Sequence, residues 1–116
     1  MSTQLQLEFA EPEARATVVT ASGDLDLVTA SELYRGVADA FERHPVLILE
    51  LSGIGFCDSS GFNALLRLRR RAEEQGTRFA LAAPPELVRR LMTLTGADAV
   101  FHIHDDVAGA LGSHLA

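Results

Sequence analysis

The sequence predicts a small α/β domain: a mixed, mostly parallel sheet with an N-terminal antiparallel hairpin and about four helices. Strand-like and helix-like segments alternate along most of the chain, which is typical of a parallel sheet with crossover helices. Residues 46–51 are apolar at nearly every position, as in a central strand covered on both faces. Two strand-like segments precede the first helix-like segment, so the sheet is expected to begin with a hairpin.

The hairpin is expected from two segments near the N-terminus. Residues 5–10 alternate apolar and polar side chains, which predicts a half-buried strand. Glu11-Pro12-Glu13 predicts a turn. Residues 16–21 predict the second strand, which is expected to close at Ser22-Gly23.

The first helix is predicted after residues 26–29, which offer helix-starting side chains. Its apolar residues recur at helical spacing: Leu33, Val37, Ala40 and Phe41. The helix is expected to end before His44-Pro45, because proline disfavours a helical conformation in the residue that precedes it.

The rest of the chain continues the alternation. The central strand at 46–51 is expected to loosen at Gly53 and Gly55. A second helix is predicted over residues 60–75, with Gly76 as its C-terminal stop. The remaining predicted elements are a strand at 78–83, a helix at 86–94, a strand at 100–103 and a helix at 106–115. Periodicity alone does not show how the helices divide between the two faces of the sheet.

Length and composition indicate one soluble globular domain over residues 1–116, with 47% hydrophobic and 22% charged residues. The N-terminus lacks the pattern of a signal peptide, and no apolar run reaches the roughly 18 residues of a membrane span. The single cysteine, Cys57, excludes an intramolecular disulfide framework and a cysteine-rich zinc site. We therefore expect a cytoplasmic protein without a membrane partner.

The charged residues exclude several function classes. A net charge of −6 argues against nucleic acid as the main partner. All ten basic residues are arginine, so chemistry that depends on lysine is excluded, including Walker-type phosphate loops and Schiff bases. The sequence indicates no cofactor.

The strongest candidate site is Asp58-Ser59-Ser60-Gly61, which follows the apolar central strand and opens the second helix. The first turn of a helix has unpaired N–H donors and the positive end of the helix dipole. Such a place suits an anion, including a phosphate on one of its own serines. From spacing alone, an ordinary N-cap is the favoured explanation of these residues.

A second acidic motif, Gly23-Asp24-Leu25-Asp26, follows the second strand. By itself this motif predicts a tight turn and an aspartate cap. If the second strand lies beside the central strand, however, the motif meets Asp58-Ser59 at one edge of the sheet, where α/β proteins bind ligands and partners. The two acidic segments would then form one surface.

Alternative chemistries for these motifs find less support. A phosphorylatable aspartate of the response-regulator type requires a lysine that the chain lacks. Ser59 as a hydrolase nucleophile lacks the first glycine of a nucleophile elbow, and the histidines show no distinguishing spacing.

Two further groups of residues have simple structural explanations. His102 and His104 share one face of a predicted strand, but no third metal ligand is evident, so we expect no metal site. The basic residues Arg67, Arg69, Arg70 and Arg71 form a patch that Glu73 and Glu74 balance on a solvated helix face. Contact with an acidic partner remains open for that patch.

The paired motifs resemble a known family. Gly23-Asp24-Leu25-Asp26 with Thr29-Ala30, followed by a buried strand and Phe56-Cys57-Asp58-Ser59-Ser60-Gly61, is similar to the STAS-domain anti-sigma factor antagonists of bacteria. The similarity spans nearly the whole chain, including the order of elements. The chain departs from the family pattern at Cys57, where an aliphatic residue is usual, and at Phe62, where leucine is usual.

The resemblance implies a partner-switching protein and not an enzyme. It implies that the unmodified form binds an anti-sigma factor with serine kinase activity and releases a sigma factor. Phosphorylation of Ser59 would end this binding, and a phosphatase would restore it. The implied partner-binding residues are Asp24, Leu25, Asp26, Thr29, Asp58, Ser60, Gly61 and Phe62. The alternative is a STAS-like scaffold or interaction module in a signalling assembly, without control by phosphate.

Overall fold

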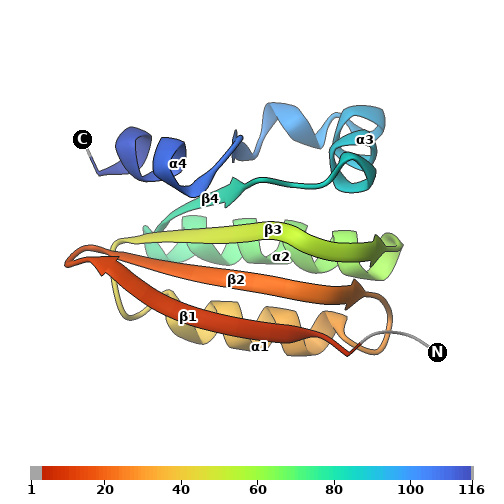
Figure 1. Ribbon diagram of the computed structural model, residues 1–116, viewed down its shortest axis with the longest axis horizontal. Helices are drawn as coiled ribbons and strands as arrows, with labels where there is room; N and C mark the ends of the chain where they lie inside the picture. The colour runs from red at the N-terminus through yellow and green to blue at the C-terminus, as the bar shows by residue number, and fades with distance from the viewer. Residues whose placement is uncertain (1–3, 116) are drawn as a thin grey trace.

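The computed structural model of the protein describes residues 4–115, which form a five-stranded sheet in the order β1-β2-β3-β4-β5 (Figure 1). Strands β1 and β2 pair antiparallel, and each later strand adds in parallel to its predecessor. The strands are β1 (Gln6–Glu13), β2 (Ala16–Leu25), β3 (Val46–Cys57), β4 (Arg78–Ala82) and β5 (His102–His104). The helices are α1 (Ala30–Ala40), α2 (Ser59–Gln75), α3 (Glu86–Thr95) and α4 (Val107–His114), with a 3-10 turn at Ala97–Ala99. The predicted fold class is confirmed.

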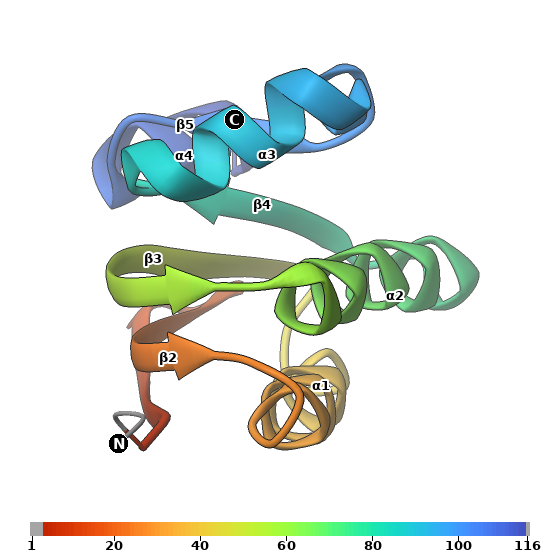
Figure 2. The ribbon, with the colours of Figure 1, turned by 90° about the vertical axis from the view of Figure 1, so that its right-hand side faces the viewer.

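The helices divide unequally between the two faces of the sheet. Helices α1 and α2 lie on the same side of β2 and β3 (Figure 2). Their buried side chains join those of α3 in the larger hydrophobic cluster, which includes Leu33, Leu65 and Val88. A smaller cluster on the other face holds Ala110 of α4 against residues such as Val18 and Ile48. The sequence pattern did not predict this division of the helices between the two faces.

The apolar composition of β3 follows from its burial on both faces of the sheet. Leu47, Leu49 and Leu51 belong to the larger cluster, whereas Val46 and Ile48 belong to the smaller one. Successive residues of a strand point to opposite faces, so a strand covered on both sides is apolar at consecutive positions. All of these side chains are almost completely buried.

Strands β2 and β3 run further than predicted, and their added residues build the candidate site. Strand β2 continues beyond Ala21 to Leu25, and β3 continues beyond Leu51 to Cys57. The glycines in these segments do not end the strands, because the β2–β3 pairing absorbs them in register shifts. Gly23 has φ +106° and passes so close to the backbone of Gln4 that no side chain fits there.

Several predicted boundaries are corrected by local structure. Strand β1 includes the segment predicted as a turn, because Pro12 sits at an irregularity of an edge strand, where no ladder N–H is required. Helix α1 keeps its predicted start, because it begins at Ala30 directly after a turn at residues 26–29. Strand β5 is shifted to His102–His104, after the 3-10 turn that the sequence pattern missed. Helix α2 begins one residue earlier than predicted, at Ser59.

Candidate functional site

Asp58 is the N-cap of α2 and determines how Ser59 is presented. The Asp58 backbone is extended, and its Oδ1 accepts hydrogen bonds from the N–H groups of Ser60 at 2.9 Å and Gly61 at 3.1 Å. This side chain satisfies two of the N–H donors that the first turn of a helix leaves unpaired. Ser59 is therefore the first helical residue, and it is exposed.

The ends of β2 and β3 meet at this cap. The two acidic motifs therefore lie at one edge of the sheet, as expected if the second strand pairs with the central strand. Leu25 pairs with Cys57 in the parallel ladder, and the Asp58 N–H donates to the carbonyl oxygen of Leu25 at 3.0 Å. The first turn of α2 also packs directly on Leu25. A Cβ atom at Gly61 would lie 2.5 Å from the Leu25 carbonyl oxygen and 2.6 Å from its Cβ. Only glycine allows this approach.

The turn between β2 and α1 is held by its own side chains. Asp26 Oδ1 accepts from the N–H groups of Val28 at 2.9 Å and Thr29 at 3.0 Å. The Thr29 hydroxyl donates to the carbonyl oxygen of Asp24 at 2.7 Å and accepts from the Asp26 N–H at 3.0 Å. Asp26 is thus a local cap, and the turn has a defined shape.

The structure brings every candidate residue to one end of the sheet, but only some of them face solvent. Ser59 is exposed, and Asp24, Asp26, Asp58 and Ser60 are half-buried. The buried candidates are Leu25, Thr29, Gly61 and Phe62. The buried residues support and shape the surface, since little of their area is open to a partner.

Three exposed apolar residues at this end of the sheet were missed by the sequence reasoning. Leu27 is 78% exposed and Val28 is 74% exposed in the turn after β2, and Phe56, the ladder partner of Asp24, is 47% exposed. The available signal was an apolar pair inside a polar turn, off the apolar stripe of the helix that follows. We call the residues Asp24, Asp26, Leu27, Val28, Phe56, Asp58, Ser59 and Ser60 the Ser59 surface.

Cys57 directly precedes the Asp58 cap, and its thiol is unreactive. Burial, followed by the nearby Asp58 carboxylate, raises the pKa of the Cys57 thiol from 9.0 to about 11. A thiol with this pKa remains protonated at neutral pH, and the thiolate is the reactive form. Cys57 is therefore a packing residue and not a nucleophile.

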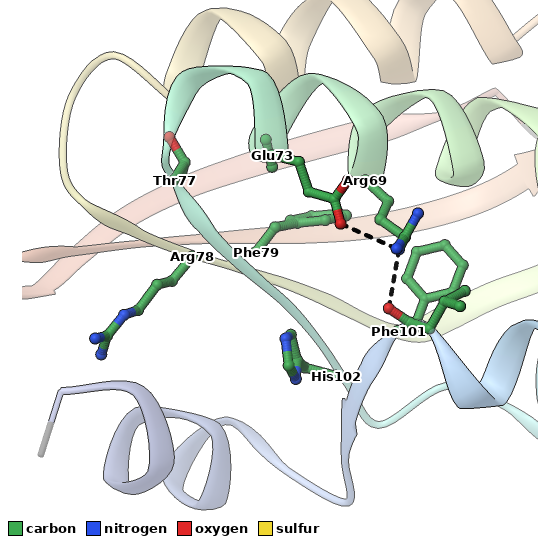
Figure 3. A pocket seen from close by; sticks show the side chains of 9 residues that line it. Arg69, Glu73, Thr77, Arg78, Phe79, Phe101 and His102 are labelled. Atoms are coloured by element: carbon green, nitrogen blue, oxygen red, sulfur yellow. Dashed lines mark hydrogen bonds and ion pairs between the residues drawn. The ribbon is translucent and has the colours of Figure 1, made fainter.

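Two arginines of the patch on α2, Arg67 and Arg69, make contacts within the chain. Arg69 binds Glu73 at 2.9 Å and donates to the carbonyl oxygen of Val100 at 2.9 Å (Figure 3). The Arg67 guanidinium lies 4.2 Å from the ring centre of Tyr34. The cavity that Arg69 lines with Phe101 and other residues has about 80 Å³, well below the roughly 300–1,000 Å³ of typical small-molecule pockets.

Within residues 4–115, no group of three or more histidine, cysteine or acidic residues is arranged to hold a metal ion. Among the helices of those same residues, none combines the length and apolar character needed to cross a membrane.

The five-stranded mixed sheet, its helices and the serine-bearing edge define a STAS-like α/β domain. The family model described as the STAS domain matches residues 9–110, and the chain therefore belongs to that family. The resemblance seen in the motifs is confirmed.

Individual relatives agree with this assignment. The chain is 28% identical over 109 residues to the anti-sigma F factor antagonist of Paenibacillus polymyxa, with 92% of each chain covered. The crystal structure of an anti-sigma factor antagonist from Mycobacterium paratuberculosis has a TM-score of 0.82 and 26% identity, covering 95% of this chain and 93% of that one. The Bacillus cell fate determinant SpoIIAA in its phosphorylated form has a TM-score of 0.72 and 18% identity, covering 93% and 98%; this likeness shows the fold alone.

Proposed function

We propose that this protein is an anti-sigma factor antagonist controlled by phosphorylation of Ser59. The unmodified form binds an anti-sigma factor with serine kinase activity and thereby releases a sigma factor. Transfer of phosphate to Ser59 ends the association, and a phosphatase restores the binding form. The protein is a kinase substrate and not a catalyst. The single observation that carries the proposal is the exposed Ser59 at the start of α2, beside a carboxylate cap on a partly apolar surface.

The relatives support the antagonist role. The similar Paenibacillus and Mycobacterium proteins are anti-sigma factor antagonists, and the alignments cover nearly the whole chain. The structurally similar SpoIIAA exists in a phosphorylated form. We place the exchange in the cytoplasm, where a buried free thiol such as Cys57 stays reduced.

The Ser59 surface has the composition of a docking surface. Leu27, Val28 and Phe56 offer apolar area that a partner can bury, and carboxylates lie around them. Hydrogen bonds hold the turn at residues 26–29 and the start of α2 in place. A surface that is already ordered loses little conformational entropy on binding.

The phosphate changes the surface without changing the fold. Phosphorylation adds about −1.5 to −2 charges at neutral pH. The positive end of α2 offsets roughly 0.3–1 kcal/mol of the electrostatic cost, so the domain remains folded. Asp58 already occupies the N–H groups of Ser60 and Gly61. The new dianion therefore stays at the surface beside Asp58, where a partner must contact it.

At the interface the same charge is costly. A phosphate beside Asp58 would have to be desolvated on binding without a matching cation, a cost of about several kcal/mol. Each ~1.4 kcal/mol changes the affinity tenfold, so the affinity is expected to fall by about a hundredfold or more. This difference is enough for a switch.

The proposal is tested with two substitutions at one position. Ser59→Ala should bind the kinase partner like the unmodified protein, whereas Ser59→Asp should bind about tenfold or more weakly. Isothermal titration calorimetry gives both affinities. Ser113→Asp adds the same charge on α4 and is the control that should bind normally. Equal affinity of the alanine and aspartate variants at position 59 would contradict the mechanism.

A second measurement assigns the modified atom. Mass spectrometry after incubation with the kinase and ATP should locate the phosphate on Ser59. Ser60 is half-buried and its N–H donates to Asp58, so we expect Ser60 to be the poorer acceptor of phosphate. Modification confined to Ser60 would show that the assignment is off by one residue. A partner that binds the Ser59 surface but modifies neither serine would favour the scaffold alternative.

A further inference from the structure

Three histidines meet where β5 faces α4, outside the Ser59 surface. The Nε2 atoms of His104 and His114 are 3.0 Å apart, and their ring planes are perpendicular with centroids 5.1 Å apart. The His102 ring lies 5.2 Å from the His114 ring. His102 and His104 come from β5, and His114 from the last turn of α4. Side chains thus join the C-terminal turn of α4 to the edge strand.

The contact between His104 and His114 depends on protonation. A hydrogen bond between two imidazole nitrogens needs a proton on one nitrogen and a lone pair on the other. When both rings are protonated, both nitrogens are donors and the two charges repel. The contact therefore exists only while at least one ring is neutral.

The surroundings of this pair favour the neutral state. Burial, and then the nearby His102, His104 and Arg78, lower the pKa of His114 below its usual value. Arg78, from β4, donates to the carbonyl oxygen of His114 at 2.8 Å and so brings a permanent positive charge to the same place. Within residues 4–115, the charged or titratable groups that act on His114 are these three, and none is a carboxylate.

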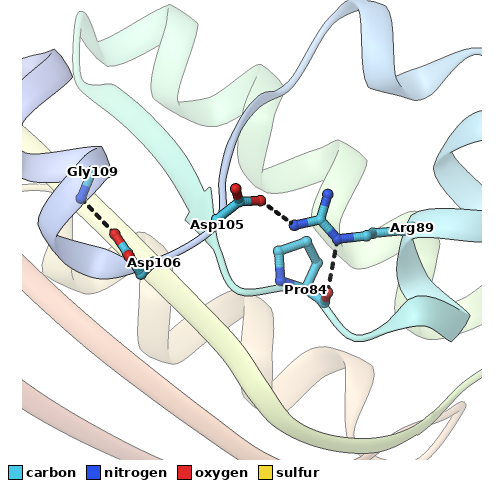
Figure 4. A network of polar contacts seen from close by, with 5 residues as sticks. All are labelled: Pro84, Arg89, Asp105, Asp106 and Gly109. Atoms are coloured by element: carbon cyan, nitrogen blue, oxygen red, sulfur yellow. Dashed lines mark hydrogen bonds and ion pairs between the residues drawn. The ribbon is translucent and has the colours of Figure 1, made fainter.

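The two ends of α4 are held by different chemistry. At its N-terminus, Asp106 Oδ1 accepts from the Gly109 N–H at 2.7 Å, and the neighbouring Asp105 binds Arg89 at 3.0 Å (Figure 4). Carboxylates make both of these contacts. At the C-terminus, the contacts are the histidine pair and the Arg78 hydrogen bond. Only the C-terminal end is sensitive to pH between about 5 and 8.

Helix α4 covers one face of the sheet. Ala110 packs in the smaller hydrophobic cluster with Val18, Ile48 and Ala80, and Leu111 and Leu115 pack against the same cluster. Figure 1 shows α4 beside β4, apart from α1 and α2. If the last turn of α4 leaves the sheet, apolar side chains of this face become accessible.

We propose that the His104–His114 pair is a pH-dependent latch, which holds the end of α4 on the sheet near neutral pH and releases it on acidification. The released state exposes part of the apolar face that Leu111 and Leu115 cover. This inference does not depend on the proposed role of Ser59. It concerns the contact between the C-terminal turn of α4 and β5, which lies outside the Ser59 surface.

The direction of the pH effect follows from His114. Its pKa is lowered in the folded protein, so folding favours the neutral ring. The stabilisation is complete above the unfolded pKa of about 6.5, and it is lost as the pH falls through the folded pKa. Each unit of difference between the two pKa values increases the open fraction of α4 by about tenfold.

Hydrogen exchange measured by mass spectrometry tests the latch. The wild-type protein is compared at about pH 8 and about pH 5.5, with rates corrected for the intrinsic effect of pH. We expect the amides of Val107–His114 to lose protection by up to tenfold per unit of pKa difference, whereas α2 keeps its protection. His114→Gln keeps hydrogen-bonding capacity but removes the ring whose pKa is lowered, so its α4 protection should be independent of pH. His104→Gln removes the paired ring and should reduce the pH response of α4.

His44 supplies the matched control. Its Nε2 lies 3.6 Å from Glu11 Oε1, so its protonation has no reason to release α4. His44→Gln should therefore keep the wild-type pH response of α4. Equal protection of α4 in the wild-type protein at both pH values would overturn the latch, and so would an unchanged pH response in both His104→Gln and His114→Gln. Circular dichroism at pH 8 establishes that each variant is folded before exchange is measured.

Discussion

Among residues 4–115, two helices begin with an aspartate cap, and one of these caps builds a candidate site. Asp58 accepts from two N–H groups at the start of α2, and Asp106 accepts from one at the start of α4. Both are normal N-cap arrangements. The difference lies in what each cap is packed against.

The two caps differ in the residues that lie beside them. Asp58 donates its N–H to Leu25, which joins the cap to the end of β2 and to its exposed apolar turn. Cys57, before it, is buried. Asp106 follows Asp105, which is exposed and pairs with Arg89. A helix N-terminus becomes a candidate partner surface here because a second strand end lies beside it and not because of the cap.

The largest effect on this comparison is expected from Gly61→Ala. The new Cβ would press on the backbone of Leu25 at 2.5 Å, which cannot move without breaking the β2–β3 edge. We expect a loss of about 2–3 kcal/mol in the free energy of unfolding, as for other overpacked sites. Gly112→Ala in α4, where the added Cβ meets nothing within 4 Å, is the control. Urea denaturation should show no loss, or a slight gain, for that variant. Equal stabilities would show that the joint between α2 and β2 is loose.

The next effect concerns the residue before the Asp58 cap. A pKa raised from 9.0 to about 11 leaves the Cys57 thiolate about a hundredfold scarcer at a given pH than in an ordinary thiol. Alkylation of the native protein at pH 8 should therefore be slower than that of the urea-unfolded protein by at least about a hundredfold. Reaction rates followed by mass spectrometry give the ratio. Similar rates in both states would mean that the start of α2 opens readily.

Removing the caps themselves has a smaller effect. Asp58→Ala and Asp106→Ala should each cost about 1 kcal/mol of stability, with the larger loss at Asp58 because its carboxylate accepts from two N–H groups. Urea denaturation measures both. Asp58→Asn keeps a capping side chain and should recover most of the loss. A larger loss at Asp106 would reverse the ranking of the two caps.

The smallest effect is expected next to the second cap. Asp105 is 95% exposed in its side chain although it pairs with Arg89 at 3.0 Å. Exposed ion pairs of this kind contribute less than about 1 kcal/mol, so Asp105→Ala should change the stability by only a few tenths. The same urea experiment, repeated in high salt, should remove even that difference. A loss comparable to that of Asp106→Ala would give this ion pair a structural role that its exposure does not suggest.

The sequence predicted the elements well and their ends less well. The apolar run at 46–51 identified a central strand, and Gly76 marked a helix end that the structure confirms with a positive φ of 72°. The sequence pattern predicts a strand end at Gly23 and a loosening of the chain at Gly53, yet both residues lie within strands, β2 and β3. A glycine can end a strand, or it can make room for a neighbouring strand. The sequence alone does not distinguish these two roles, because it does not show which strand is the neighbour.

The candidate site was predictable in part for the same reason. Asp58 and Ser59 were found from their position between a buried strand and a helix. Leu27, Val28 and Phe56 were missed, since exposure depends on what packs above them. Thr29 and Phe62, also predicted as partner-binding residues, are buried, so they can support the surface but offer little area to a partner.

Local chemistry in the chain determined the alternation of strands and helices, the aspartate caps and the serine at the start of α2, because these depend on residues close together in sequence. Tertiary structure decided that β2 lies beside β3, that Gly61 packs on Leu25, and that His104 meets His114. Each of these pairs is distant along the chain. Their meeting is set by how the whole sheet buries its apolar faces, and no local pattern records that outcome.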